Sequence, residues 1–137
     1  MKEMKAQSSF EVLITVAILI AFSIPIILAA LAISQLRLDD FSLSHGKATV
    51  QYLSDNINEV YLEGNASKRT ILLDFPSNTK NLTISNHTII LYLTSSSGVY
   101  EISHPFFADT TDFSIAKRGI ASVVLSMNNG KVNLSNG

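Results

Sequence analysis

QSSFEVLITVAILIAFSIPIILAALAI, residues 7–33, is the stretch that decides the fold of this chain. It begins with short polar residues and Glu11, and from Val12 to Ile33 it contains no charged residue. At about 1.5 Å per residue, a helix over 12–33 spans roughly the 30 Å hydrocarbon layer of a membrane. A domain of this size cannot bury so many apolar side chains, so the sequence predicts a helix that needs a partner other than its own core.

The residues before this stretch are basic, with Lys2 and Lys5 against Glu3. A short positive segment followed by an apolar run is typical of a secretory signal or a signal anchor. An ordinary signal peptide has an apolar core of about 7 to 15 residues and then a small-residue cleavage site. The run here is longer and has no polar cleavage region after it, which excludes the ordinary signal peptide.

Polar and small residues interrupt the apolar run. Pro25 lacks a backbone N–H and predicts a bend or a loosened helix over 21–25. Small residues recur at helical spacing and would allow close helix packing, although Ala is also common in membrane helices. These positions are Ala17, Ala21, Ala30 and Ser34.

The helix is expected to continue beyond the apolar run, over residues 7–64 in all, with an amphipathic second half. Apolar residues at spacings of three or four predict one buried stripe. Gly46 lies inside this pattern and costs the helix about 1 kcal/mol relative to Ala, and Gly64 is a plausible stop. The predicted stripe consists of Phe41, His45, Ala48, Tyr52, Leu53, Ile57, Val60 and Tyr61.

Residues 65–137 read as a β-rich domain. Segments rich in β-branched and aromatic residues alternate with Asn, Ser, Gly and Pro. Hairpin turns are predicted at Asn86-His87, at residues 95–98 and at Asn129-Gly130. The expected fold class is α+β, a long N-terminal helix packed on a C-terminal antiparallel sheet of four to six strands. The predicted strands are 70–75, 81–85, 88–94, 98–103, 120–127 and 131–135.

Composition excludes several classes of function. The 137 residues have a formal net charge of −1 and no Cys, so a strongly basic nucleic-acid binder and a disulfide framework are both excluded. His45, His87 and His104 share no metal-ligand spacing, and there is no glycine-rich phosphate loop. The Asp residues are scattered along the sequence, and no recognisable nucleophile or paired acid accompanies them. We therefore expect no enzyme activity, no cofactor and no nucleic-acid partner.

Two features remain open from the residues alone. Four Asn-x-Ser/Thr sequons, at Asn65, Asn81, Asn86 and Asn133, fit an exported glycosylated surface but also arise by chance in a chain rich in Asn and Ser. Glu11 at the head of an apolar helix costs several kcal/mol if it is buried unpaired. It could equally lie at the membrane interface, favoured by the helix dipole.

The pattern Gln7-x-Ser9-x-Glu11 ahead of the long apolar helix resembles the class III signal sequence of archaeal type IV pilins, Q-x-S-x-E-x-x-x-L. The resemblance covers about the first 33 residues. Thr15 stands where the pattern has Leu, although Leu13 and Ile14 keep the segment hydrophobic. The helix and β domain agree with the lollipop shape of that family only in general outline.

The resemblance implies a leader of residues 1–6, cut by a membrane prepilin peptidase between Ala6 and Gln7, with Ser9 and Glu11 in the recognised sequence. It implies that residues 11–34 anchor the subunit in the cell membrane. An assembly ATPase and a platform protein would then drive it into a helical filament of identical copies on the cell surface, and the resemblance implies a role in surface adhesion. Glu11 would neutralise an N-terminal amine, that of Gln7 in its own or a neighbouring subunit. Close packing of the helices would involve Ala17, Ala21, Pro25, Ala30 and Ser34.

Three alternatives share much of this sequence pattern. A minor pilin or a pseudopilin of an envelope machine would be processed in the same way. An uncleaved signal-anchored surface protein, whose β domain binds a ligand, would keep residues 1–6.

Overall fold

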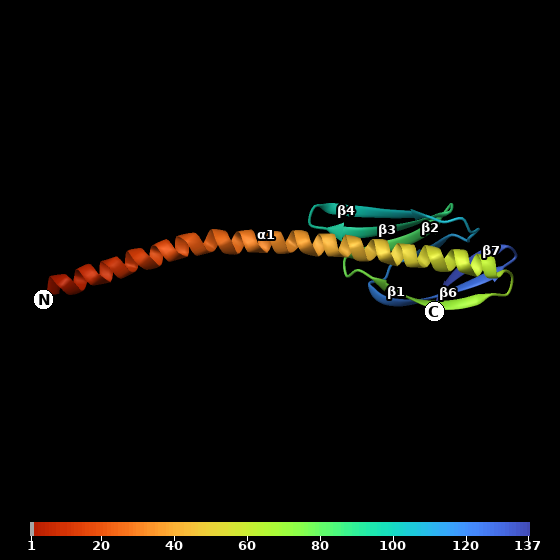
Figure 1. The fold of residues 1–137 in the computed structure, drawn as a ribbon, viewed down its shortest axis with the longest axis horizontal. Helices are drawn as coiled ribbons and strands as arrows, with labels where there is room; N and C mark the ends of the chain where they lie inside the picture. Colours follow the sequence, from red (N-terminus) through yellow and green to blue (C-terminus); the bar gives the residue numbers. More distant parts are fainter. Residues whose placement is uncertain (1) are drawn as a thin grey trace. The chain divides into compact units, whose positions relative to one another are not determined.

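The computed structural model describes the backbone of residues 2–137 and the side chains of residues 9–137. One helix, α1 (Lys2–Glu63), precedes seven strands in the described part of the chain (Figure 1). The strands are β1 (Lys68–Phe75), β2 (Thr79–Ser85), β3 (Thr88–Ser95), β4 (Gly98–Pro105), β5 (Phe113–Ile115), β6 (Gly119–Asn128) and β7 (Lys131–Asn136). The chain divides into two units, of which the first ends at Leu38 and the second, here the head unit, is Asp39–Gly137.

The head unit holds two antiparallel sheets. The first has the strand order β1-β6-β7 and the second the order β4-β3-β2-β5. The α+β layout with antiparallel strands is confirmed, but the prediction of a single sheet of four to six strands was wrong. The division arises because β1 pairs with β6, about fifty residues later in the chain, while β2 pairs with β3 and β5.

Local turn chemistry shapes the hairpins. Asn86 and His87, with φ of 49° and 62°, join β2 to β3, and Asn129 and Gly130, with φ of 51° and 78°, join β6 to β7. Two successive left-handed residues are what a two-residue hairpin turn requires, because their twist matches that of the strands. These two predicted turns and the one between β3 and β4 are confirmed.

The second half of α1, from Asp39 onward, covers the core of the head unit. In Figure 1 it runs between the two sheets, with β2, β3 and β4 on one side and β1 and β6 on the other. Leu53, Ile57 and Val60 are fully buried. They pack with the inward rows of both sheets, whose burial alternates along the strands.

The predicted stripe of the helix also included Phe41, Ala48 and Tyr52 on the row beside Leu53, and this part of the prediction was wrong. Phe41 is 69% exposed and Tyr52 is 49% exposed, and Ala48 is exposed as well. The buried row next to Leu53 consists of Gly46, Thr49 and Val50 instead. Gly and Thr are not strongly apolar, so the spacing of apolar residues did not mark them as buried. The predicted stripe therefore lay on the neighbouring face of the helix.

Gly46 and Thr49 bring the helix close to both sheets. A Cβ at Gly46 would lie 2.8 Å from the terminal Cδ1 of Ile102 on β4, so a side chain at this position would force that methyl group to shift. Thr49 Oγ1 donates to the carbonyl oxygen of Asp74 on β1 at 2.6 Å. The glycine that is unfavourable for the helix itself therefore favours close packing of the helix against β3 and β4.

The helix ends at Glu63 with a local cap. Gly64 has φ of 88°, the left-handed conformation that commonly follows a helix. The Ser67 hydroxyl shares its one hydrogen between the carbonyl oxygens of Gly64, at 2.7 Å, and of Val60, at 3.0 Å. These bonds satisfy groups that a helix end otherwise leaves unpaired.

Candidate functional site: the apolar half of the long helix

The side chains in the apolar half of α1 are exposed and are not covered by any other described residue of residues 1–38. The fifteen large apolar side chains from Phe10 to Ile33 are 45–70% exposed. The most apolar window of this helix has a mean hydropathy of 2.9, and none of that window is buried. By length and composition α1 is able to cross a membrane.

Glu11 lies at the head of this surface and is exposed. No ion-pair partner of its carboxylate occurs among the side chains from residue 9 onward. Ser9 is also exposed, whereas the side chains of Ala6 and Gln7 lie outside those described. The structure therefore leaves the Glu11 carboxylate accessible to a group from outside the chain.

The polar residues of the apolar half bond to their own helix. Thr15 Oγ1 donates to the carbonyl oxygen of Glu11 at 2.9 Å, and Ser23 Oγ donates to that of Leu19 at 2.7 Å. Each hydroxyl is thus satisfied without water, as a hydroxyl in lipid or in a packed helix bundle must be. The helix assignment continues through Pro25, over the segment where a bend was predicted.

The small residues form two separate patches. Ala17 and Ala21 lie one turn apart, as do Ala30 and Ser34, and all four are exposed. Thirteen residues separate Ala17 from Ala30, and at about 100° per residue the two patches point about 140° apart around the helix. One neighbouring helix cannot cover both patches, so close packing at both requires two neighbours.

A pair of hydrogen bonds fixes the β3–β4 turn to the first residue of the head unit. Asp39 Oδ2 accepts from Ser95 Oγ at 2.6 Å and from Ser96 Oγ at 3.0 Å. Ser97 Oγ and the Tyr100 hydroxyl lie 2.9 Å apart in the same turn. Sequence reasoning missed this connection, because 56 residues separate Asp39 from Ser95 and neither belongs to a recognisable motif.

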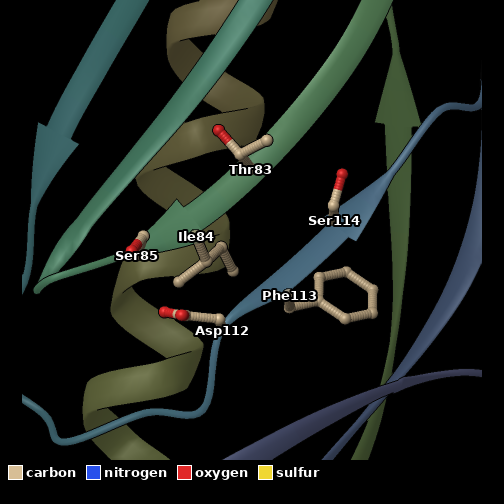
Figure 2. A pocket seen from close by; sticks show the side chains of 6 residues that line it. All are labelled: Thr83, Ile84, Ser85, Asp112, Phe113 and Ser114. Atoms are coloured by element: carbon tan, nitrogen blue, oxygen red, sulfur yellow. The ribbon is translucent and has the colours of Figure 1, made fainter.

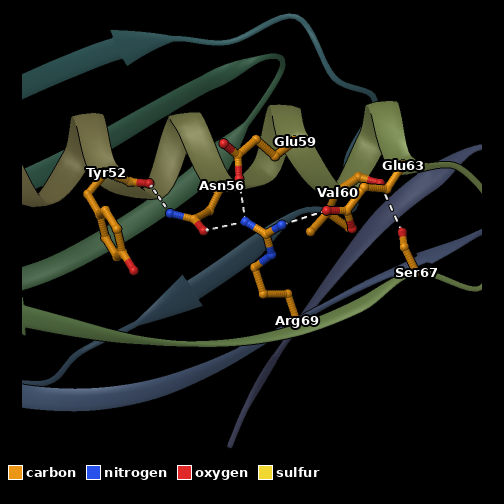
Figure 3. Close-up of polar contacts among 7 residues, drawn as sticks. All are labelled: Tyr52, Asn56, Glu59, Val60, Glu63, Ser67 and Arg69. Carbon is orange, nitrogen blue, oxygen red and sulfur yellow. Dashed lines mark hydrogen bonds and ion pairs between the residues drawn. The ribbon is translucent and has the colours of Figure 1, made fainter.

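A second polar cluster fixes the end of α1 to β1 (Figure 3). The Arg69 guanidinium contacts the carboxylate of Glu59, lies 2.5 Å from Oε1 of Glu63 and donates to Asn56 Oδ1 at 3.2 Å. The hydrogen bond with Glu59 is the main cause that raises the pKa of Arg69, despite partial desolvation. Arg69 lies in the inward-facing row of β1, two residues before the buried Ile71. The sequence offered only the weak signal of a basic residue before an apolar strand.

The four sequons occupy two kinds of position. Asn65 and Asn86 are exposed and lie in turns, whereas Asn81 on β2 and Asn133 on β7 are half-buried within strands. Asn65 Oδ1 also accepts a hydrogen bond from the Gly130 amide at 3.4 Å. The structure therefore distinguishes two accessible sequons from two that are constrained.

The histidines do not form a common site. His45 Nε2 lies 3.3 Å from Asp74 Oδ2, and His87 Nε2 lies 2.9 Å from Asp109 Oδ1. Over the described residues no three His, Asp or Glu side chains gather in a way that could hold a metal ion. Both pairs connect separate segments of the head unit, which is a structural role.

An open hollow lies between β2 and β5 (Figure 2). Its lining residues are Thr83, Ile84, Ser85, Asp112, Phe113 and Ser114. Thr83 and Ser114 are paired across the two strands and carry their hydroxyls on the outer face. Among the described residues no side-chain hydrogen bond joins Asp112 to these hydroxyls and no histidine lines the hollow, so the residues here are not arranged for catalysis.

Comparisons with protein-family models, with curated proteins and with solved structures found no match to this chain.

Proposed function

We propose that this chain is a structural subunit of an extracellular filament of the archaeal type IV pilus kind. The observation that carries the proposal is the exposed apolar half of α1, directly preceded by Gln7-x-Ser9-x-Glu11. Neither feature is needed to build the head unit, which has its own buried core.

The apolar half favours two successive environments. Burying a large apolar side chain contributes about 1.5–3 kcal/mol, so fifteen such side chains disfavour a monomer in water by tens of kcal/mol. A membrane can hold them first, and the helices of other subunits can hold them later. The same surface then serves as anchor and as filament core.

Glu11 has a role in the assembled state under this proposal. Cleavage between Ala6 and Gln7 creates an amine at Gln7, four residues before Glu11. A carboxylate and an amine buried together cost far less than either buried alone. Glu11 would pair with the amine of its own or a neighbouring subunit as water leaves the helix bundle.

The mature N-terminus tests the proposal directly. Intact mass and N-terminal sequencing of the protein from the native surface should give a chain that begins at Gln7. Glu11→Gln should still be cleaved and membrane-inserted but should yield far fewer filaments. A surface product that begins at Met1 contradicts the proposal.

An uncleaved signal-anchored protein is the second candidate, and Thr15 in place of the Leu of the signal pattern favours it. It predicts retention of residues 1–6 and no effect of Glu11→Gln. A minor pilin or a pseudopilin would share the cleavage. Such a chain should be scarce in filaments sheared from the cell surface, whereas a major subunit should be abundant there.

A further inference from the structure

Strand β4 leaves one edge of the second sheet without a neighbouring strand. It comes first in the strand order β4-β3-β2-β5 and pairs only with β3, which puts it at the margin of the head unit in Figure 1. All of its residues except Ile102 and His104 are exposed. An open edge of this length presents backbone N–H and C=O groups to which another strand can pair.

Alternate residues of β4 turn their backbone groups away from β3. The Phe106 amide donates to the carbonyl oxygen of the residue before β3 at 3.0 Å, so Phe106 faces β3 and Pro105 faces the open side. The same alternation directs the amides of Val99, Glu101 and Ser103 to the open side, where no described residue accepts a hydrogen bond from them. Pro105, which has no N–H, stands in this row, where its missing donor removes no bond to β3.

We propose that the β4 edge binds the β4 edge of a second copy of this chain in antiparallel orientation, with Glu101 of each copy opposite Ser103 of the other. A two-fold axis beside Ile102 then relates the two strands. A contact of this kind uses the same surface on both copies and closes after two, so it cannot by itself extend into a filament. The inference therefore goes beyond the proposed function and depends neither on cleavage nor on filament assembly.

The outer face of β4 is self-complementary in this register. The Ser103 hydroxyl of one copy lies opposite the Glu101 carboxylate of the other and can donate to it. Val99 lies opposite Pro105, so an apolar pair flanks the polar one at each end. The two central pairs exchange two N–H···O bonds each, as hydrogen-bonded pairs of an antiparallel ladder do.

The inner face of β4 has the same symmetry. Ile102, which is 7% exposed, lies opposite Ile102 of the other copy and continues the core across the contact. Tyr100, which is 44% exposed, lies opposite His104. Cross-strand pairs of apolar and aromatic side chains stabilise a sheet, so both faces favour the same register.

Other registers are disfavoured. A shift by one residue places amides that already bond to β3 opposite the open ones. A shift by two residues sets the two Glu101 carboxylates opposite each other, which is repulsive, or sets Pro105 opposite Glu101, where an N–H···O bond is lost. The Ser54 hydroxyl of α1 lies 3.5 Å from the Pro105 carbonyl oxygen, so the open part of the edge is centred on Glu101 and Ser103.

The contact is weak for two dilute copies. A few hydrogen bonds and side-chain pairs at one strand edge bury less than the roughly 1,200 Å² of a stable interface. Copies that are concentrated by a membrane or by a filament meet at a high effective concentration, which favours a weak contact. The β4 edge would then connect subunits in pairs, in addition to any packing of α1.

Single-cysteine variants measure the register, because the chain has no Cys. The full chain in detergent, carrying Glu101→Cys, Ser103→Cys or Val99→Cys, is treated with a bismaleimide that has a two-carbon spacer. In the proposed register the two copies of residue 101, and those of residue 103, are diagonal neighbours about 7–8 Å apart. The two copies of residue 99 are about 20 Å apart along the strands. We expect at least about threefold more crosslinked dimer at residues 101 and 103 than at residue 99.

Two further variants control this measurement. Thr70→Cys, exposed on β1 of the other sheet, reports dimers that form through α1 and should give as little crosslinking as Val99→Cys. Ser103→Pro removes an N–H on the open side and no bond to β3. Added to Glu101→Cys, it should lower the dimer yield to that of Val99→Cys, while circular dichroism monitors the fold.

The outcomes separate this inference from the proposed function. Equal yields at residues 70, 99, 101 and 103, or an absence of dimer at 101 and 103, overturn the β4 contact and leave the filament proposal standing. An unchanged yield in the folded variant with Ser103→Pro also overturns it. A surface chain that begins at Met1 overturns the filament proposal and leaves the β4 contact standing.

Discussion

Arg69 on β1 joins the last turn of α1 through Glu63, whose Oε1 lies 2.5 Å from its Nη2. The same guanidinium contacts Glu59 and donates to the amide oxygen of Asn56, which is 7% exposed. The fork of five donors in Arg suits such a set of acceptors, and the single ammonium of Lys does not. An arginine guanidinium stays charged in proteins, and the hydrogen bond with Glu59 raises the pKa of Arg69 further.

Arg69→Met should lower the thermal midpoint of the full chain in detergent, because it leaves the Asn56 oxygen and two carboxylates without their donor. Arg69→Lys should fall between the parent and Arg69→Met. Lys68→Met is the control, since Lys68 is exposed and forms no ion pair among the described residues. Equal midpoints for Arg69→Met and Lys68→Met would show that the cluster does not stabilise the head unit.

Substitution of Gly46 by Ala has two opposing effects on the free energy of unfolding. Gly46→Ala gains about 1 kcal/mol of helix propensity. The new Cβ meets terminal methyls of Ile102, Leu91 and Leu93 at 2.8 to 3.1 Å, and overpacking costs about 1–3 kcal/mol. We expect a net loss of up to about 2 kcal/mol for Ala, and a larger loss for Gly46→Leu, by denaturant unfolding.

Ala48→Gly is the matched control for this series. Ala48 is exposed on the same helix, so the change should cost only the propensity term of about 1 kcal/mol. A stabilised Gly46→Leu variant would contradict the close approach of the helix to β3 and β4.

Much of this fold is predictable because its signals are local. The hairpin at Asn129-Gly130 follows from two residues that accept left-handed conformations, and the end of α1 at Glu63 follows from Gly64. The exposure of the apolar half also follows from residues 12–33, since no domain of this size can cover them.

What was not predictable depends on distant partners. The pairing of β1 with β6 divides the strands into two sheets, and β5, only three residues long, is too short to show a period. The buried face of α1 depends on Gly46, whose role is visible only when β4 is in place. The bonds from Asp39 to Ser95 and Ser96 had no sequence signal at all.

The sequons should differ in occupancy if the exported chain is glycosylated. Asn65 and Asn86 are exposed in turns, and we expect glycans there before the half-buried Asn81 and Asn133. Glycopeptide mass spectrometry of the surface protein measures this order. Asn65→Gln should remove one glycan, whereas Thr88→Ala is preferable for the second site because Asn86 has φ of 49°, which suits Asn better than Gln. Glycans on Asn81 or Asn133 alone would contradict the order.

Ala17 and Ala21 test whether the apolar half packs closely in a filament. Both are exposed in the subunit, so Ala17→Leu or Ala21→Leu introduces no clash within one chain and should insert into the membrane as well as the parent. Close helix approach depends on small side chains, so the yield of sheared filaments should fall sharply. Ile18→Leu is the control, because it keeps the size of a side chain that already projects from the helix.

Because the two small patches point about 140° apart, Ala30→Leu should also reduce the filament yield, through a different neighbouring helix. Filament yields equal to the parent in all three Leu variants of Ala17, Ala21 and Ala30 would rule out a tightly packed helical core at these positions.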